Sequence, residues 1–226
     1  MPNIREANRE KRKELCLKLK QTEETFHDVI FTDESSFQLG MNRQLAVSKV
    51  VRNSKGKIIS KDTPFVSKFK HPLKVHVWGG ISRRGATELL VLDGIMDAEF
   101  YTNKILKETL LPAISHLYPP PMTHRFWQDN DPKHTSKKAK AFMEENDINW
   151  FKTPAESPDL NPIEMVWSTM KFHVAKKSPK NKQELIDTIL EVWEMEFTAE
   201  KCNNYISHLY KVIPKVIEAE GGYSGC

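Results

Sequence analysis

The sequence predicts an α/β domain in which a mostly β first half is followed by alternating helices and strands. Three observations support this fold class. Short apolar runs are separated by polar residues between positions 29 and 92, apolar residues recur at helical spacing from position 97 onward, and Pro119, Pro120 and Pro121 separate the two halves. A strand–helix–strand–helix–strand order that follows a β meander is typical of a partly parallel sheet.

Length and composition exclude several classes of protein. With 226 residues, 39% of them hydrophobic, the chain is long enough to bury a core without a structural metal or a disulfide. Its three cysteines, Cys16, Cys202 and Cys226, have no CxxC spacing and predict neither a zinc site nor a disulfide framework. No apolar run approaches the ~18 residues of a membrane span. We therefore expect a soluble, unsecreted protein that does not contact a membrane and resides in a reducing compartment.

The first half is predicted to begin with a helix and to continue as sheet. Residues 1–25 form a basic helix with few apolar positions, chiefly Leu15 and Leu19, and are interpreted as an interdomain linker rather than a core element. Strands are predicted over 29–31, 36–39, 74–81 and 88–92. Residues 41–73 are polar and turn-rich, which indicates an insertion after the first strands, with a hairpin formed by 45–51 and 57–59.

The second half is predicted to alternate helices and strands before it becomes wholly helical. Asp97 is expected to cap a helix over 97–118. Further strands are predicted over 123–128 and 148–151, and further helices over 134–145, 163–174, 183–197 and 199–211. Apolar residues at helical spacing, such as Ile163, Val166 and Trp167, should face the core in these helices.

Two aspartates follow predicted strands. Asp33 follows the letters VIFT and Asp129 follows FWQ. Ligands of open α/β sheets gather beyond the carboxyl ends of the strands, so both acids fall at one edge if the strands are parallel neighbours. Carboxylates suit Mg²⁺ or Mn²⁺, but an aspartate after a strand is also a common turn former, and the residues alone leave both interpretations open. Glu34 is expected on the opposite face of the strand, and Asp131 is the nearest competitor to Asp129.

Glu164 also has two interpretations. Asn161, Pro162, Ile163 and Glu164 match the first positions of a helix, in which Glu164 would close a capping box with Asn161. A carboxylate in the first turn of a helix, after a loop stiffened by prolines, is equally well held for a metal ion. The pattern alone does not separate cap from ligand.

The residues beside the second acid are candidates for supporting roles. Asn130 and His134 are expected to orient a carboxylate, a water or a phosphate, and His134 is not expected to bind metal because the other candidate ligands are oxygens. Lys133, Lys137 and Lys138 fit contacts to DNA phosphates, with solvated surface charge as the alternative.

Four phrases carry a resemblance to a known family. IFTDESSF, VHVWGGIS, QDNDPKHTS and SPDLNPIEMVW, in this order, closely resemble the catalytic domain of transposases of the mariner/Tc superfamily. The 34 residues between Asp129 and Glu164 match the spacing of the Asp-Asp-Glu triad in the Tc-like branch. The resemblance covers about residues 5–222.

The resemblance implies a fold and an activity. The fold is RNase H-like over residues 26–222, with a mixed five-stranded sheet flanked by helices. Asp33, Asp129 and Glu164 are implied as catalytic residues and as ligands of two Mg²⁺ (or Mn²⁺) ions. The implied reaction is metal-dependent cleavage of double-stranded DNA at transposon ends, by hydrolysis, followed by strand transfer into target DNA. The insertion at 41–73 corresponds in position to a segment that contacts a second subunit in related transposases, so a homodimer is implied.

One part of the family pattern is missing. Family members carry upstream helix-turn-helix modules that recognise the transposon ends, and residues 1–25 are too short for one such module. We therefore expect nuclease chemistry with poor end specificity, in the nucleus. The alternative is a domesticated or decayed transposase derivative that binds DNA without cutting it.

Overall fold

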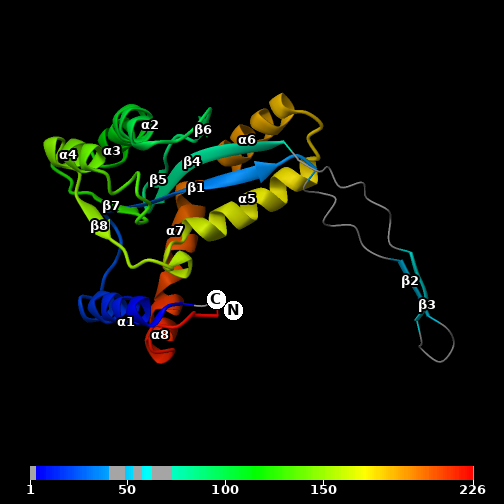
Figure 1. The fold of residues 1–226 in the computed structure, drawn as a ribbon, viewed down its shortest axis with the longest axis horizontal. Coiled ribbons are helices and arrows are strands. Elements are labelled where there is room, and N and C mark those ends of the chain that lie inside the picture. The colour runs from blue at the N-terminus through cyan, green and yellow to red at the C-terminus, as the bar shows by residue number, and fades with distance from the viewer. Residues whose placement is uncertain (1–3, 41–48, 53–57, 63–72, 226) are drawn as a thin grey trace.

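The computed structural model describes residues 4–40, 49–52, 58–62 and 73–225. A mixed sheet lies at the centre of the molecule, with helices on both faces and a basic helix beside the C-terminal end of the chain (Figure 1). None of the helices in these ranges has the length and apolarity that a membrane crossing needs.

The central sheet is mixed, as predicted. Its order is β5 (Gly85–Ala86), β4 (Lys74–Ser82), β1 (Val29–Gln38), β7 (Arg125–Gln128) and β8 (Trp150–Lys152), and β6 (Leu90–Leu92) also pairs with β4. β4 runs antiparallel to β1, β5 and β6, whereas β1, β7 and β8 are parallel. Because β5 and β6 share the edge of β4 that faces away from β1, six segments fill five strand positions.

The polar insertion contributes a separate two-stranded sheet. β2 (Lys49–Arg52) and β3 (Ile58–Asp62) pair antiparallel, which confirms the predicted hairpin for these strands. The rest of the predicted insertion, at 41–48, 53–57 and 63–72, lies outside the described residues.

The helices follow the predicted order. Residues 98–117 form one continuous rod, made of α2 (Ala98–Phe100), the π-helix η2 (Tyr101–Leu110) and α3 (Leu111–Leu117). Asp97 caps this rod, since its side chain accepts a hydrogen bond from the Phe100 N–H. The others are α1 (Glu6–Gln21), α4 (Lys137–Glu145), the short 3₁₀ helix η3 (Pro158–Leu160), α5 (Ile163–Lys177), α6 (Lys182–Glu196), α7 (Ala199–Ser207) and α8 (Leu209–Glu218).

Each face of the sheet has its own core. Side chains alternate across the strands, so Phe31 and Trp127 face α5 to α8, whereas Ile30 and Phe126 face η2, α3 and α4. Trp78 and Trp167 are each 1% exposed, and for Trp167 this confirms the predicted position in the core. The two apolar layers hold the strand ends that carry the predicted acids in a fixed frame.

Helix α1 belongs to the core, contrary to the expectation from its polar sequence. Cys16 and Leu19 are buried in the larger apolar cluster. Arg12 and Asp159 form a two-pronged ion pair at 2.8 Å, with side chains that are 0% and 2% exposed. A buried arginine breaks the apolar spacing from which a core helix is recognised, so the pattern hides this contact. Whether residues 1–25 also serve as a linker stays a prediction, as does the domain range 26–222.

The C-terminal segment closes over α1. Arg12 donates to the carbonyls of Gly221 and Gly222, and Arg9 donates to the carbonyl of Ala219. Gly221 has a φ of +77°, and a Cβ there would lie 1.9 Å from the Arg9 carbonyl oxygen, so only glycine fits. The two ends of the polypeptide therefore hold each other.

Some predicted boundaries are wrong. The strands predicted at 29–31 and 36–39 are one strand, β1, because the polar residues between them still pair with β4. The helix predicted from residue 134 begins at Lys137, where Ser136 caps it. The helix predicted over 199–211 is divided at His208 into α7 and α8 and continues to Glu218, with Pro214 inside α8.

Candidate active site

The parallel pairing of β1 with β7 brings the two predicted aspartates to one place. Val29, Ile30 and Phe31 pair with residues 125–127 of β7. Continuing this register by two residues places Asp33 beside Asp129, although Asp33 lies within β1 and not at its end. β1 runs on past the end of β7, so both acids lie where the parallel pairing stops.

Asp129 is held by a short hydrogen-bonded chain. His134 Nδ1 lies 2.6 Å from Asp129 Oδ1, and His134 Nε2 lies 3.0 Å from Glu34 Oε1. The imidazole is buried and packs against the ring of Tyr101, with 4.2 Å between the ring centroids. Burial alone would lower the pKa of His134, but its hydrogen bonds to the two carboxylates raise the pKa to about 9. His134 is therefore a doubly protonated bridge at neutral pH.

The same hydrogen bonds keep Asp129 ionised. Burial by itself would raise the pKa of this carboxyl, but the hydrogen bonds from His134 and from the Asp131 N–H hold the pKa below its ordinary value. Both of these hydrogen bonds are to Oδ1, and the side chain is 59% exposed. Oδ2 accepts no hydrogen bond from a described residue and is available to an external cation.

Glu164 reaches the site from the first turn of α5, and its interpretation as a cap is wrong. The helix starts at Ile163 without any side-chain cap hydrogen bond. Asn161 instead donates from Nδ2 to the Thr32 carbonyl at 3.1 Å, which ties the loop before α5 to β1 beside Asp33. This tether, rather than a capping box, places Glu164 on the same cavity as Asp33.

The three acids line one cavity of about 290 Å³. Asp131 and Glu156 also line it, and none of the described residues around it is Lys or Arg. Burial, followed by the negative charges of Glu34 and Glu164, raises the pKa of Asp33 to about 8. Asp129, Asp131 and Glu156 are paired with His134, Lys133 and Arg5. Among the described residues, Asp33 and Glu164 have no cationic side chain as a partner.

The donor set suits a hard divalent cation in its chemistry, although its members stand apart. Among the described residues, no three His, Cys, Asp or Glu side chains lie close enough together to hold a metal ion as they stand. The candidate donors are carboxylate oxygens, which Mg²⁺ and Mn²⁺ prefer. The pKa of Asp33 is raised first by burial and then by repulsion from Glu34 and Glu164, and a bound cation would oppose that repulsion. Asp129 and Glu164 have exposed side chains, which the surrounding residues do not pack in place.

The other predicted residues have mixed placements. Asn130 donates to the Thr153 carbonyl and so fixes the loop beside the cavity. Lys133 is paired with Asp131 at 2.7 Å, and Lys138 is paired with Glu99 at 2.9 Å. Lys137 is exposed in the first turn of α4. These lysines reach acids of the chain or solvent, and their contacts to DNA stay a prediction.

Two residues of the site were missed by sequence reasoning. Glu34 was expected on the far face, but it contacts the site through His134, whose ring spans the distance to Asp129. Asn161 was interpreted as a helix cap and is a tether to β1. The adjacent acidic pair Asp33–Glu34 and the single buried histidine could have indicated the first, whereas no local signal indicates the second.

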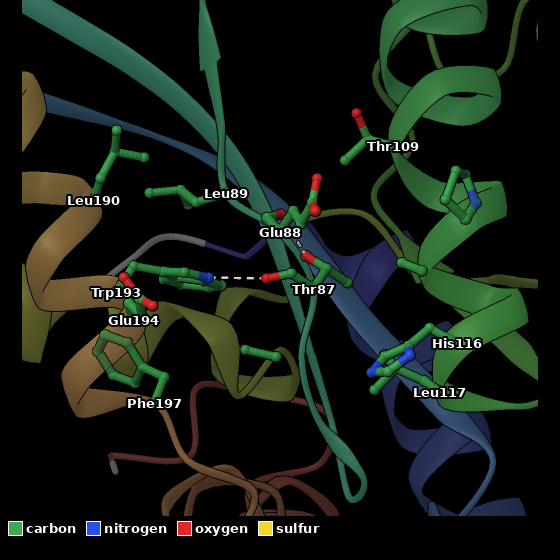
Figure 2. Close-up of a pocket in the computed structure, with 13 residues that line it drawn as sticks. Thr87, Glu88, Leu89, Thr109, His116, Leu117, Leu190, Trp193, Glu194 and Phe197 are labelled. Carbon is green, nitrogen blue, oxygen red and sulfur yellow. Dashed lines mark hydrogen bonds between the residues drawn. The ribbon is translucent and has the colours of Figure 1, made fainter.

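A larger cavity, of about 760 Å³, lies elsewhere and contains none of the predicted site residues. It is bounded by α3, α6 and residues 86–89, and Figure 2 shows Trp193 of α6 donating its indole N–H to the Thr87 carbonyl there. Glu88, Glu194 and His116 are separated by apolar side chains such as Leu89 and Leu117. Because charge and hydrogen-bonded acids gather at the smaller cavity, that cavity is the candidate active site.

The chain is similar to known proteins. The family model described as DDE superfamily endonuclease matches residues 28–186. The Tcb2 transposable element transposase of Caenorhabditis briggsae is 36% identical over 120 residues, which are 53% of this chain and 43% of that protein. The chain therefore matches less than half the length of this relative.

Solved structures of the Mos1 transposase share the fold. A paired-end complex with the left transposon end has a TM-score of 0.81 at 18% identity, covering 98% of this chain and 65% of that one. The Mos1 catalytic domain with Raltegravir and Mg has a TM-score of 0.74 at 19% identity, covering 98% and 99%. These likenesses confirm the predicted RNase H-like arrangement of a mixed sheet between helices.

Proposed function

Because the chain belongs to the DDE superfamily of endonucleases, as a catalytic domain of the Tc1/mariner transposase type, we propose that it cuts DNA strands at transposon ends and joins them to target DNA. The observation that carries the proposal is the gathering of Asp33, Asp129 and Glu164, from three distant parts of the sequence, around one acidic cavity. Hydrolysis and transesterification of phosphodiesters commonly require divalent ions held by such acids.

Each residue has a proposed task. Asp33, Asp129 and Glu164 would hold two Mg²⁺ or Mn²⁺ ions, which when bound supply activation of the attacking oxygen and neutralise charge on the leaving oxygen. His134 holds Asp129 through Oδ1 and leaves Oδ2 free to bind. Asn161 fixes the loop that carries Glu164. The chain supplies position and charge, and no side chain need form a covalent bond to DNA.

A plasmid assay tests the proposal. The protein and its Asp129→Asn variant are incubated with supercoiled plasmid and with Mg²⁺, Mn²⁺ or EDTA. We expect nicked and linear products only from the unaltered protein and only with metal, because the variant loses one charged ligand. Equal cutting by both proteins would contradict the site assignment. DNA binding without cutting by either would favour the alternative of a transposase derivative that has lost catalysis.

The partners and the location follow from the same proposal. Double-stranded DNA is the proposed substrate, and Mos1, whose fold this chain shares, has been solved in complex with a transposon end. A homodimer and residence in the nucleus, where chromosomal DNA lies, are proposed on the same basis. Size-exclusion chromatography with light scattering tests the dimer, and imaging of a tagged protein tests the location.

A further inference from the structure

A second cavity adjoins the candidate active site and differs from it in charge. It has a volume of about 510 Å³ and lies between α1 and residues 152–155. Asn130, Thr153, Pro154 and Ala155 line both this cavity and the acidic one. The two cavities are therefore neighbours with a shared wall, and we call the second one the α1 groove.

One face of α1 forms a wall of the α1 groove. Asn8, Lys11, Leu15 and Lys18 line it, and their spacing of three, four and three residues places them along one side of the helix. Lys152, at the end of β8, also lines the groove. With a rise of 1.5 Å per residue, Lys11 and Lys18 are separated by about 10 Å along the helix, close to the rise of about three base pairs of DNA.

The lysines of the groove are free, in contrast to those predicted from the sequence. Lys11, Lys18 and Lys152 are exposed, and none has a hydrogen bond or ion pair from its side chain to another described residue. Lys133 and Lys138 are each paired with an acid of the chain. Glu14 is the one acid among the described residues that line the groove, so the groove has an excess of positive charge beside an acidic cavity.

The wall is also rigid. Arg12 joins α1 to η3 through the buried pair with Asp159, and Arg5 and Asn8 bind the carboxylate of Glu156. Glu156 itself lines the acidic cavity. A helix fixed in this way holds its lysines at a constant distance from the proposed catalytic acids. Contacts from these lysines to DNA phosphates would therefore position the strand relative to the acids.

We propose that the α1 groove binds the phosphate backbone of the DNA strand next to the phosphate being cut, through Lys11, Lys18 and Lys152. The inference rests on the proposed function, since it assumes that the acidic cavity acts on DNA. The acids of the cavity repel the polyanion, so the DNA must gain its attraction nearby, and the groove supplies three unpaired cations at the shared wall.

Equilibrium binding in EDTA tests the groove without any cutting. A fluorescent DNA duplex is titrated with the unaltered protein, with the triple variant Lys11→Gln, Lys18→Gln and Lys152→Gln, and with a control triple that loses the same charge at exposed, unpaired Lys107, Lys176 and Lys211. Three phosphate contacts predict a loss of about tenfold or more at 0.1 M salt and a salt-dependence slope smaller by about 2 to 3. The control triple should bind almost normally, with a slope changed by less than about 1.

A gain-of-binding variant guards against misfolding as an explanation. Glu14→Gln removes the acid of the groove and should tighten DNA binding several-fold, which a damaged fold would not produce. Equal weakening by the two triple variants, or weaker binding by Glu14→Gln, would overturn the proposal that the α1 groove binds DNA.

The outcome is separable from that of the plasmid assay. If the unaltered protein cuts plasmid with metal but the groove and control triple variants bind DNA equally well, the proposed role of the α1 groove is wrong and the proposed function stands. If the groove triple binds more weakly but no protein cuts, the groove stands as a DNA-binding surface and the proposed catalysis fails.

Discussion

Two acids of the molecule, Asp159 of η3 and Asp33 of β1, are treated in opposite ways by the fold. Asp159 receives two hydrogen bonds from Arg12 and one from the Ser224 N–H. Burial alone would raise the pKa of Asp159, but these partners hold the pKa below its ordinary value. Asp33 receives one backbone hydrogen bond, from Glu34, and its pKa rises to about 8. The chain neutralises the acid that joins its helices and gives Asp33 no cationic partner among the described residues.

The largest effect is expected from removing the arginine that neutralises Asp159. Arg12→Met leaves Asp159 buried and unpaired and should lower the free energy of unfolding by about 3 to 5 kcal/mol. Urea denaturation followed by circular dichroism measures this change. Arg9→Met on the same helix, where the arginine is 37% exposed, is the matched control and should cost no more than about 1 kcal/mol. A similar cost for both variants would mean that the Arg12–Asp159 pair is not the principal anchor of α1.

The next largest effect is expected from adding a divalent cation to the protein. Mg²⁺ at 100 times its dissociation constant should stabilise the protein by about 2.7 kcal/mol, seen as a higher melting temperature than in EDTA. Asp129→Asn and Glu164→Gln should lose most of this gain because each removes a proposed ligand. Asp147→Asn, at an exposed acid outside the cavity, should retain it. A gain of equal size in all four proteins would show that the ions bind elsewhere.

The last expected effect is absent at low pH and concerns the charge of Asp33 without metal. Its pKa is raised in the folded state, so its contribution to stability in EDTA is fully present below pH ~4 and is lost as pH rises toward 8. Asp33→Asn should therefore match the wild type near pH 4 and become more stable than it as pH rises. It should also abolish metal-dependent cutting. Parallel stability curves for the two proteins between pH 4 and 8 would contradict this account.

Much of the fold was predictable because apolar periodicity is a local signal. The strands at Lys74–Ser82 and Arg125–Gln128 and the long helical rod after Asp97 all appear where the pattern placed them. The continuity of β1 was not predictable. Its polar middle residues pair with β4 through the backbone, and their side chains do not show the apolar pattern of a strand. Helix α1 resembled a linker for a related reason, because its anchor is a buried charge.

The candidate site was predictable only in part. Residue chemistry alone left Asp33, Asp129 and Glu164 as turn formers, caps or ligands, and the family resemblance selected the last. The supports of these acids are tertiary contacts: His134 bridges Asp129 to Glu34, and Asn161 reaches the Thr32 carbonyl. The contacts to β1 join residues 100 and 129 positions apart and leave no periodic trace in the sequence.

The mutual grip of the two ends of the polypeptide has a topological consequence. Arg9 and Arg12 hold residues 219–222 across more than 200 positions, and α1 packs beside α8 (Figure 1). A circular permutant, with a short glycine-serine peptide from residue 225 to residue 4 and new termini in an exposed turn such as residues 146–147, should therefore keep the same architecture.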